Sequence, residues 1–195
     1  YAPAEAVRFL AHAVARSDEP GADLLLSLGT AMKQTGRFTD AAERFEAALT
    51  VESDRLRRAE ILALLADVHR ATWDLERGLA VVARGLTELG TPVSGNPFAK
   101  TVTAVMMFVA AVLLEWTGVR PGATRPDRRR RCALASDLHR MGSYLSALQM
   151  RLGDVLVHAI RSLYWGNRIG EGQQYVHAQT ALGVITAATG LYRPS

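Results

Sequence analysis

The chain has 195 residues, 49% of them hydrophobic and 22% charged, a balance that excludes a disordered or fibrous protein and supplies material for a buried core. Its formal net charge is +4, and the four arginines at 128–131 account for all of it (4 − 4 = 0), so any nucleic-acid contact is confined to one short patch. The single cysteine, Cys132, excludes an internal disulfide and a paired-cysteine zinc site, and a reducing cytoplasm is therefore expected.

Residues 1–16 carry apolar side chains three and four positions apart, at Ala6, Leu10, Ala13 and Val14. This spacing is typical of one face of a helix. We interpret the segment as the second helix of a helix-pair repeat whose first helix is missing. The segment also lacks the basic and apolar pattern of a signal peptide. We therefore expect a cytoplasmic chain that is a piece of a larger protein.

The clearest pattern begins at residue 22, where small and large residues occupy fixed positions: Leu28, Gly29, Met32, Gly36, Phe38, Ala41, Phe45 and Ala48. The small residues allow two antiparallel helices to approach closely, and the large ones fill the space between them. Gly36 is expected to end the first helix. Gly29 is expected where the helices cross, so Gly29→Leu should destabilise the chain strongly and Gly29→Ala much less.

A second copy follows without gaps when 37 is added to each of these numbers: Leu65, Ala66, His69, Trp73, Leu75, Gly78, Val82 and Gly85. Trp73 takes the place of the turn glycine, which predicts a distorted turn. Residues 22–90 therefore predict two helix-pair repeats in tandem and an all-α fold.

The spacing resembles that of the tetratricopeptide repeat family. The resemblance implies antiparallel helix pairs stacked into a right-handed α-solenoid, with a groove lined by the first helix of each repeat. The groove positions in this chain are Asp23, Leu26, Thr30, Lys33, Gln34, Glu60, Ala63, Asp67, Arg70 and Ala71. Family members that bind chaperones hold a terminal carboxylate there with Lys, Asn and Arg. The mixed side chains here predict a different protein or peptide, or a neighbouring domain, as ligand.

Residues 97–117 predict an inserted helix between two loops, 90–97 and 118–127, that are rich in Gly, Pro and Ser or Thr. The helix is apolar nearly all round, and its main face carries Val102, Val105, Met106, Val109, Val112, Leu113 and Trp116. Its charge-free stretch, 101–114, is shorter than the about 20 residues of a membrane span. We expect a buried core helix; a docking surface for a missing domain or a second chain is the alternative.

Four consecutive arginines, Arg128, Arg129, Arg130 and Arg131, follow Pro126 and a potential helix cap, Asp127. The first turn of a helix is unfavourable for cations because the helix dipole is positive there. A solvated loop is the favoured interpretation. An acidic protein partner and nucleic acid are the alternatives.

Residues 128–195 predict degenerate repeats that end in the middle of a repeat. One weak copy carries Leu145, Gly153 and Val155, with His158 and Ser162 in place of the expected alanine and aromatic residue. A final first helix is indicated by Leu182, Gly183, Thr186, Gly190 and Tyr192.

No catalytic or metal-binding motif is present in the sequence. Five histidines stand singly, without the spacing of metal ligands: His12, His69, His139, His158 and His177. Cys132 is expected to be inert, although a thiol pKa lowered by Arg131 is an alternative. We therefore expect neither an enzyme nor a bound cofactor.

The order of repeats, long apolar helix, arginine-bearing loop and further repeats resembles the helical region of large bacterial signal-transduction ATPases, including maltose-activator-like transcription regulators. The resemblance implies a cytoplasmic sensor or coupling region that binds proteins. The phosphate loop GxxxxGK[ST] is absent from these residues. The alternative is a ligand-binding or enzymatic helical domain with a pocket between the apolar helix and the C-terminal repeats. A homodimer is left open, nucleic acid is disfavoured and no membrane contact is expected.

Overall fold

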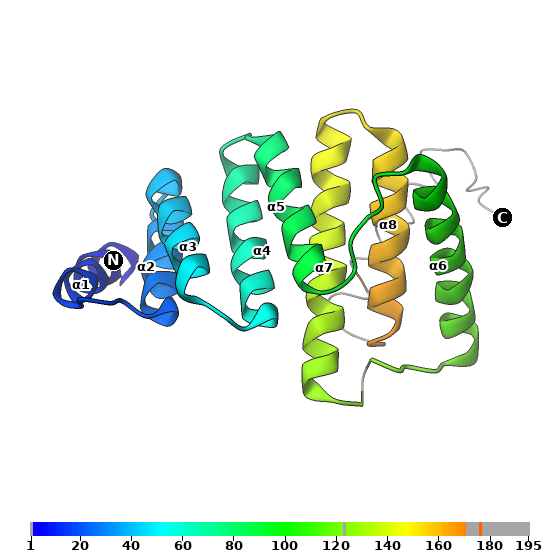
Figure 1. Cartoon of the computed structure of the whole chain (residues 1–195), viewed down its shortest axis with the longest axis horizontal. Coiled ribbons are helices and arrows are strands. Elements are labelled where there is room, and N and C mark those ends of the chain that lie inside the picture. The colour runs from blue at the N-terminus through cyan, green and yellow to red at the C-terminus, as the bar shows by residue number, and fades with distance from the viewer. Residues whose placement is uncertain (1, 123, 171–175, 177–195) are drawn as a thin grey trace. The chain divides into compact units, whose positions relative to one another are not determined.

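A computed structural model describes residues 2–122, 124–170 and 176, and these residues form eight α-helices without strands (Figure 1). The expected all-α fold is confirmed. The chain, expected to be one domain, divides into two compact units, Tyr1–Glu88 (unit 1) and Leu89–Ser195 (unit 2). The final first helix expected around Leu182 and Tyr192 lies outside the described residues.

Unit 1 consists of five helices joined by short connections: α1 (Ala2–Arg16), α2 (Ala22–Gln34), α3 (Phe38–Val51), α4 (Arg55–Ala71) and α5 (Leu75–Glu88). Each helix packs against the next along the chain. These bounds agree with the expected helix at 1–16 and with the two helix pairs expected between residues 22 and 90. Among the described residues of this unit, every fully buried side chain is apolar.

Gly29 lies where α2 crosses α3, as its spacing predicts. A Cβ atom placed on Gly29 would lie 2.7 Å from Phe45 Cε1 and 3.3 Å from Arg44 Cβ. Phe45 is itself fully buried, as are Ala41 and Ala48 on the same helix. Because the ring has no free space to move into, even Gly29→Ala meets a steric conflict, which the sequence pattern does not indicate.

The turns that join three helix pairs, two in unit 1 and the last two helices of the described chain, have the same backbone geometry. The turn residues Gly36, Trp73 and Met150 all have positive φ, of 78°, 60° and 58°. In each turn, the next amide N–H donates to a carbonyl five residues earlier: Arg37 to Met32, Asp74 to His69 and Arg151 to Ser146, each at 2.9 Å. The expectation of a distorted turn at Trp73 is wrong, because Trp73 adopts the left-handed conformation that glycine adopts in the first turn. A non-glycine residue does so at a conformational cost.

Unit 2 contains α6 (Pro97–Thr117), α7 (Pro126–Leu148) and α8 (Leu152–Asn167). The helices α7 and α8 form a hairpin, and α8 lies between α7 and α6 (Figure 1). Residues 89–96, which lead into α6, are held by two arginines: Arg131 donates to the Leu89 carbonyl at 2.6 Å and Arg161 to the Pro92 carbonyl at 3.2 Å.

The apolar helix α6 has the expected bounds, 97–117. Asn96 caps its start by accepting from the Phe98 and Ala99 amides, Pro97 occupies the first turn, and Gly118 ends it with φ of 67°. Helix α7 begins at Pro126, inside the expected loop 118–127, and its N-cap is Arg125 rather than the expected Asp127.

Candidate interaction surface

One face of α6 packs on α8. Lys100, Ala104, Met107, Ala111 and Leu114 follow steps of four and three residues, which place them in one line along the helix. Ala104 and Ala111 are buried. Lys100 Nζ lies 2.6 Å from Asp154 Oδ1, and Asn167 Nδ2 donates to the Ala111 carbonyl at 3.1 Å. We call this line the inner seam.

The opposite face of α6 is exposed. It carries a second line of side chains with the same spacing, the outer seam: Phe98 (77% exposed), Val102 (41%), Val105 (56%), Val109 (52%), Val112 (49%) and Trp116 (85%). Met106, Phe108 and Leu113 flank it and are also exposed. The expectation that residues 97–117 form a buried core helix is therefore wrong. The sequence shows an apolar helix, but α8 covers only one of its sides.

The outer seam carries no charge. Residues 101–114 are uncharged, and the flanking Lys100 and Glu115 pair with Asp154 and, at 3.5 Å, with Arg120. Monomeric soluble proteins seldom expose contiguous apolar patches larger than a few hundred Å² unless the patch binds something. Among the described helices, α6 is also the one that is long and apolar enough to span a membrane by length and composition, a property it shares with many core helices.

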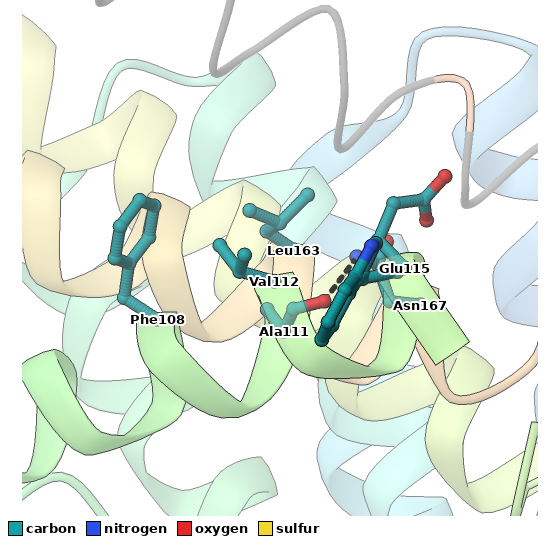
Figure 2. A pocket seen from close by; sticks show the side chains of 7 residues that line it. Phe108, Ala111, Val112, Glu115, Leu163 and Asn167 are labelled. Atoms are coloured by element: carbon teal, nitrogen blue, oxygen red, sulfur yellow. Dashed lines mark hydrogen bonds between the residues drawn. The ribbon is translucent and has the colours of Figure 1, made fainter. Parts of the chain in front are cut away.

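A pocket of about 390 Å³ opens between α6 and α8 (Figure 2). Its walls are mainly apolar, and its lining residues are Phe108, Ala111, Val112, Glu115, Trp116, Leu163 and Asn167. Asn167 is 2% exposed, and its Oδ1 atom has no protein hydrogen-bond partner although its Nδ2 atom binds the Ala111 carbonyl. A buried acceptor without a donor is costly, and this one belongs to a residue in the wall of an apolar pocket.

The structure joins several of the expected groove residues through ion pairs. Lys33 Nζ lies 2.9 Å from Asp67 Oδ2, and Arg70 donates to Asp67 Oδ1 at 2.8 Å. Burial raises the pKa of the Asp67 carboxyl, but hydrogen bonds from Lys33 and Arg70 outweigh this effect and hold the pKa below its ordinary value. Asp23 pairs with Arg57, a residue the sequence pattern does not single out.

These pairs link α2 to α4, the first helices of successive helix pairs. Glu60 adds an electrostatic attraction to Arg57. Leu26, Thr30 and Glu60 are half-buried, and Gln34 is exposed. The charged side chains on this face therefore bind one another, which leaves no cluster of cations for a carboxylate ligand.

The arginine run does not act as one patch. Arg128, Arg129 and Arg130 are exposed near the start of α7, whereas Arg131 binds the Leu89 carbonyl through both Nε and a terminal nitrogen. The fourth arginine thus has a structural contact that the sequence does not reveal. The first three remain candidates for contact with an acidic partner.

Unit 2 contains buried polar pairs that the sequence pattern missed. His139 and His158 were expected to stand singly, but their Nδ1 atoms lie 3.0 Å apart between α7 and α8. Burial lowers the pKa of His158 to about 4 and the pKa of His139 well below 6.5. Ser136 and Ser162, one turn or so away, exchange hydrogen bonds across the same hairpin. The sequence signal was confined to His158 and Ser162, which stand where the repeat pattern expects an alanine and an aromatic residue.

The thiol of Cys132 is buried, and burial raises its pKa, with Arg168 opposing the rise. This direction agrees with the expectation of an inert cysteine and runs against the alternative of a thiol pKa lowered by Arg131. Among the described residues, no group of three or more His, Cys, Asp and Glu side chains is placed to hold a metal ion.

The chain has no significant match to a family model, a curated protein or a solved structure.

Proposed function

We propose that this chain is a non-catalytic protein-interaction region built from tetratricopeptide-like helix pairs, and that it recognises its partner through the outer seam of α6. The observation that carries the proposal is the exposure of six apolar side chains in line on α6, none of them next to an unpaired charge. Burying such a line against another protein is favourable by about 25 cal/mol per Å² of apolar surface.

Unit 1 supports this role as a scaffold. Its core is apolar, its helices pack in sequence, and cross-helix ion pairs join α2 to α4 and α4 to α5. Such an arrangement resembles the tandem packing of repeat proteins, whose stability comes from contacts between neighbouring repeats. We further propose that the region couples domains within a cytoplasmic bacterial signalling or transcription-control ATPase, with the order of repeats, long apolar helix, arginine-bearing segment and further helices as its support.

Site-specific photocrosslinking tests the proposal. A photoreactive phenylalanine analogue at Val109, expressed in the full chain in cells, is expected to form protein adducts, and the same analogue at Tyr144 is the control. Tyr144 lies on α7 in the same unit and is 47% exposed, against 52% for Val109. Val105→Lys should remove the Val109 adducts. Equal labelling at both positions, or labelling that survives Val105→Lys, would contradict a role for the outer seam.

The pocket beside Asn167 favours a second candidate, the binding of a small apolar ligand that carries one hydrogen-bond donor. Indole and indene form a matched pair of probes, because they have similar size and only indole has an N–H group. If Asn167 Oδ1 accepts from a ligand, calorimetry should show indole binding about tenfold more tightly than indene, and Asn167→Leu should remove the difference. Equal affinity for the two probes would exclude this candidate.

A further inference from the structure

We propose that the outer seam of α6 pairs with the outer seam of a second copy of this chain, in antiparallel orientation about a two-fold axis. The inference rests on the proposed function, because it takes α6 as the recognition surface, and it goes beyond it by naming the partner. Four features of α6 support it: the spacing of the seam, its symmetry, its flanks and its area.

The spacing of the outer seam is that of a helix-pairing seam. Its residues, 98, 102, 105, 109, 112 and 116, are separated by steps of four and three, the pattern of the a and d positions of a coiled coil. The inner seam has the same steps and packs on a helix, α8. One side of α6 therefore already shows that this spacing fits a helical partner. The other side presents the same spacing, and α8 approaches it only where Val112 and Trp116 line the pocket.

The outer seam is symmetric about residue 107. When two copies run antiparallel about this point, the chemistry of opposing side chains matches: Val105 faces Val109, Val102 faces Val112 and Phe98 faces Trp116 of the other copy. Each layer then joins an a position to a d position, which keeps the side chains in register. The four central valines are short and allow close approach, and the aromatic pairs close both ends. Antiparallel helices also place opposite ends of their dipoles together.

The residues on either side of the outer seam are mostly uncharged. They therefore favour a second copy of this chain over a partner that carries complementary charges. The adjacent positions are Ala99, Met106 and Leu113 on one side and Thr101, Phe108 and Glu115 on the other. In coiled coils these positions choose the partner through opposite charges. Glu115 is the one charge here, and it pairs with Arg120. A second copy brings the same apolar flanks, so no charged group loses its partner on association.

The exposed apolar area is comparable in size to one side of a typical interface. Scaled by their exposed fractions, the six seam residues and the flanking Met106, Phe108 and Leu113 expose on the order of 900 Å². A typical specific interface covers about 800 Å² on each partner. A two-fold contact needs only one self-complementary surface, and the outer seam provides it.

Sedimentation of the full chain tests this inference. At about 50 µM the chain should sediment as a dimer, and Val105→Lys with Val109→Lys should weaken dimerisation at least about 100-fold because four ammonium groups would enter one apolar interface. Both positions are exposed, so folding should be retained, as checked by circular dichroism. The matched control is Tyr144→Lys with Leu148→Lys on α7, which should remain dimeric.

Orientation is tested by disulfide formation in a Cys132→Ala background. Mixing a Phe98→Cys chain with a Trp116→Cys chain should give a mixed disulfide, whereas either chain alone should give little. Homodimeric disulfides from each chain alone would instead show a parallel pair and overturn the antiparallel arrangement.

The remaining outcomes separate this inference from the proposed function. A monomer at 50 µM whose Val109 analogue still crosslinks to another protein would overturn the homodimer and leave the proposed function standing. A monomer without adducts, or one that binds vesicles of phosphatidylcholine and phosphatidylglycerol through α6, would overturn both. A dimer that persists in the folded lysine variant would show that another surface pairs the chains.

Discussion

Units 1 and 2 place their polar and apolar groups differently. In unit 1 the buried side chains are apolar and the charges lie outside, where Lys33–Asp67 and Arg58–Glu88 join successive helices. In unit 2 the buried polar residues are Ser136, His139, Ser146, Arg161, Ser162 and Asn167, while α6 exposes nine large apolar side chains. Unit 1 thus buries apolar side chains and pairs its charges at the surface, whereas unit 2 buries polar side chains and exposes a continuous apolar line on α6.

The largest effect is expected from overfilling the core of unit 1. Gly29→Leu should cost about 3 kcal/mol or more in the free energy of unfolding, because the side chain meets the buried Phe45 ring. Gly29→Ala should also be destabilising, since its Cβ lies 2.7 Å from the same ring. The control is Gly153→Leu in the first turn of α8, where a Cβ meets nothing within 4 Å. Urea denaturation that ranks the two leucine variants equally would show that the crossing is loosely packed.

Acid should destabilise unit 2 more than unit 1. The folded pKa of His158 is about 4, below the unfolded value of 6.5, so the unfolded state binds the proton first as the pH falls. The stabilisation is complete above pH 6.5 and is lost between pH 6.5 and 4, by about 2 kcal/mol at pH 5 for this histidine alone. His139, whose pKa is lowered in the same direction, adds to the loss.

Hydrogen exchange at pH 7 and pH 5, corrected for the intrinsic rates, reports on both units at once. Amides of α7 and α8 should lose protection on acidification more than those of α2 and α3. An equal loss in both units would mean that the histidine pair is not buried as a neutral pair.

Relief of the two strained turns should stabilise both units by similar amounts. Trp73→Gly and Met150→Gly should each add roughly 0.5 to 1 kcal/mol, because a residue with φ near 60° is replaced by one that adopts this conformation without steric cost. Trp73 and Met150 are 70% and 78% exposed, so little packing is lost. Thermal melts measure the gain. A loss of stability in either variant would show that the side chain packs more than its exposure indicates.

The smallest effect is expected on the arginine run. Changing Arg128, Arg129 and Arg130 to glutamate should alter the free energy of unfolding by less than about 0.5 kcal/mol each, because these side chains are exposed. Arg131→Glu should cost about 1 kcal/mol or more, since Leu89 loses two hydrogen-bond donors. Urea denaturation of the triple and single variants compares them. A larger loss in the triple variant would place the structural contact elsewhere.

Much of unit 1 could be predicted from the sequence because the signals are local. Gly36, Phe38 and Ala41 fix a turn and a crossing within one helix pair, and the repeat at 37 residues extends them to α4 and α5. The ends of α6 were also predictable, since Pro97 and Gly118 mark the start and stop of a helix by their backbone preferences. The left-handed backbone conformation of Trp73 could not be predicted, because non-glycine residues seldom adopt positive φ.

The candidate surface was harder to predict because it depends on which helices cover α6. Composition shows that residues 97–117 are apolar all round, but the coverage of each side depends on contacts with α8, over 50 residues later. The pairing of His139 with His158 likewise joins positions 19 residues apart across a hairpin whose repeat pattern is weak. The repeat pattern predicts that charged residues such as Lys33 and Asp67 lie on the groove face. It does not predict that they pair, because pairing depends on the distance between α2 and α4.

The central claim, that the outer seam of α6 is a recognition surface that pairs with its own copy, is tested most directly by methyl NMR of the valines at increasing protein concentration. Val102, Val105, Val109 and Val112 should shift together as the dimer forms. Val51, 54% exposed on α3 in unit 1, should not shift. If the four α6 valines keep the same shifts from dilute to concentrated solution, or if Val51 shifts as much as they do, the outer seam does not pair two copies of this chain.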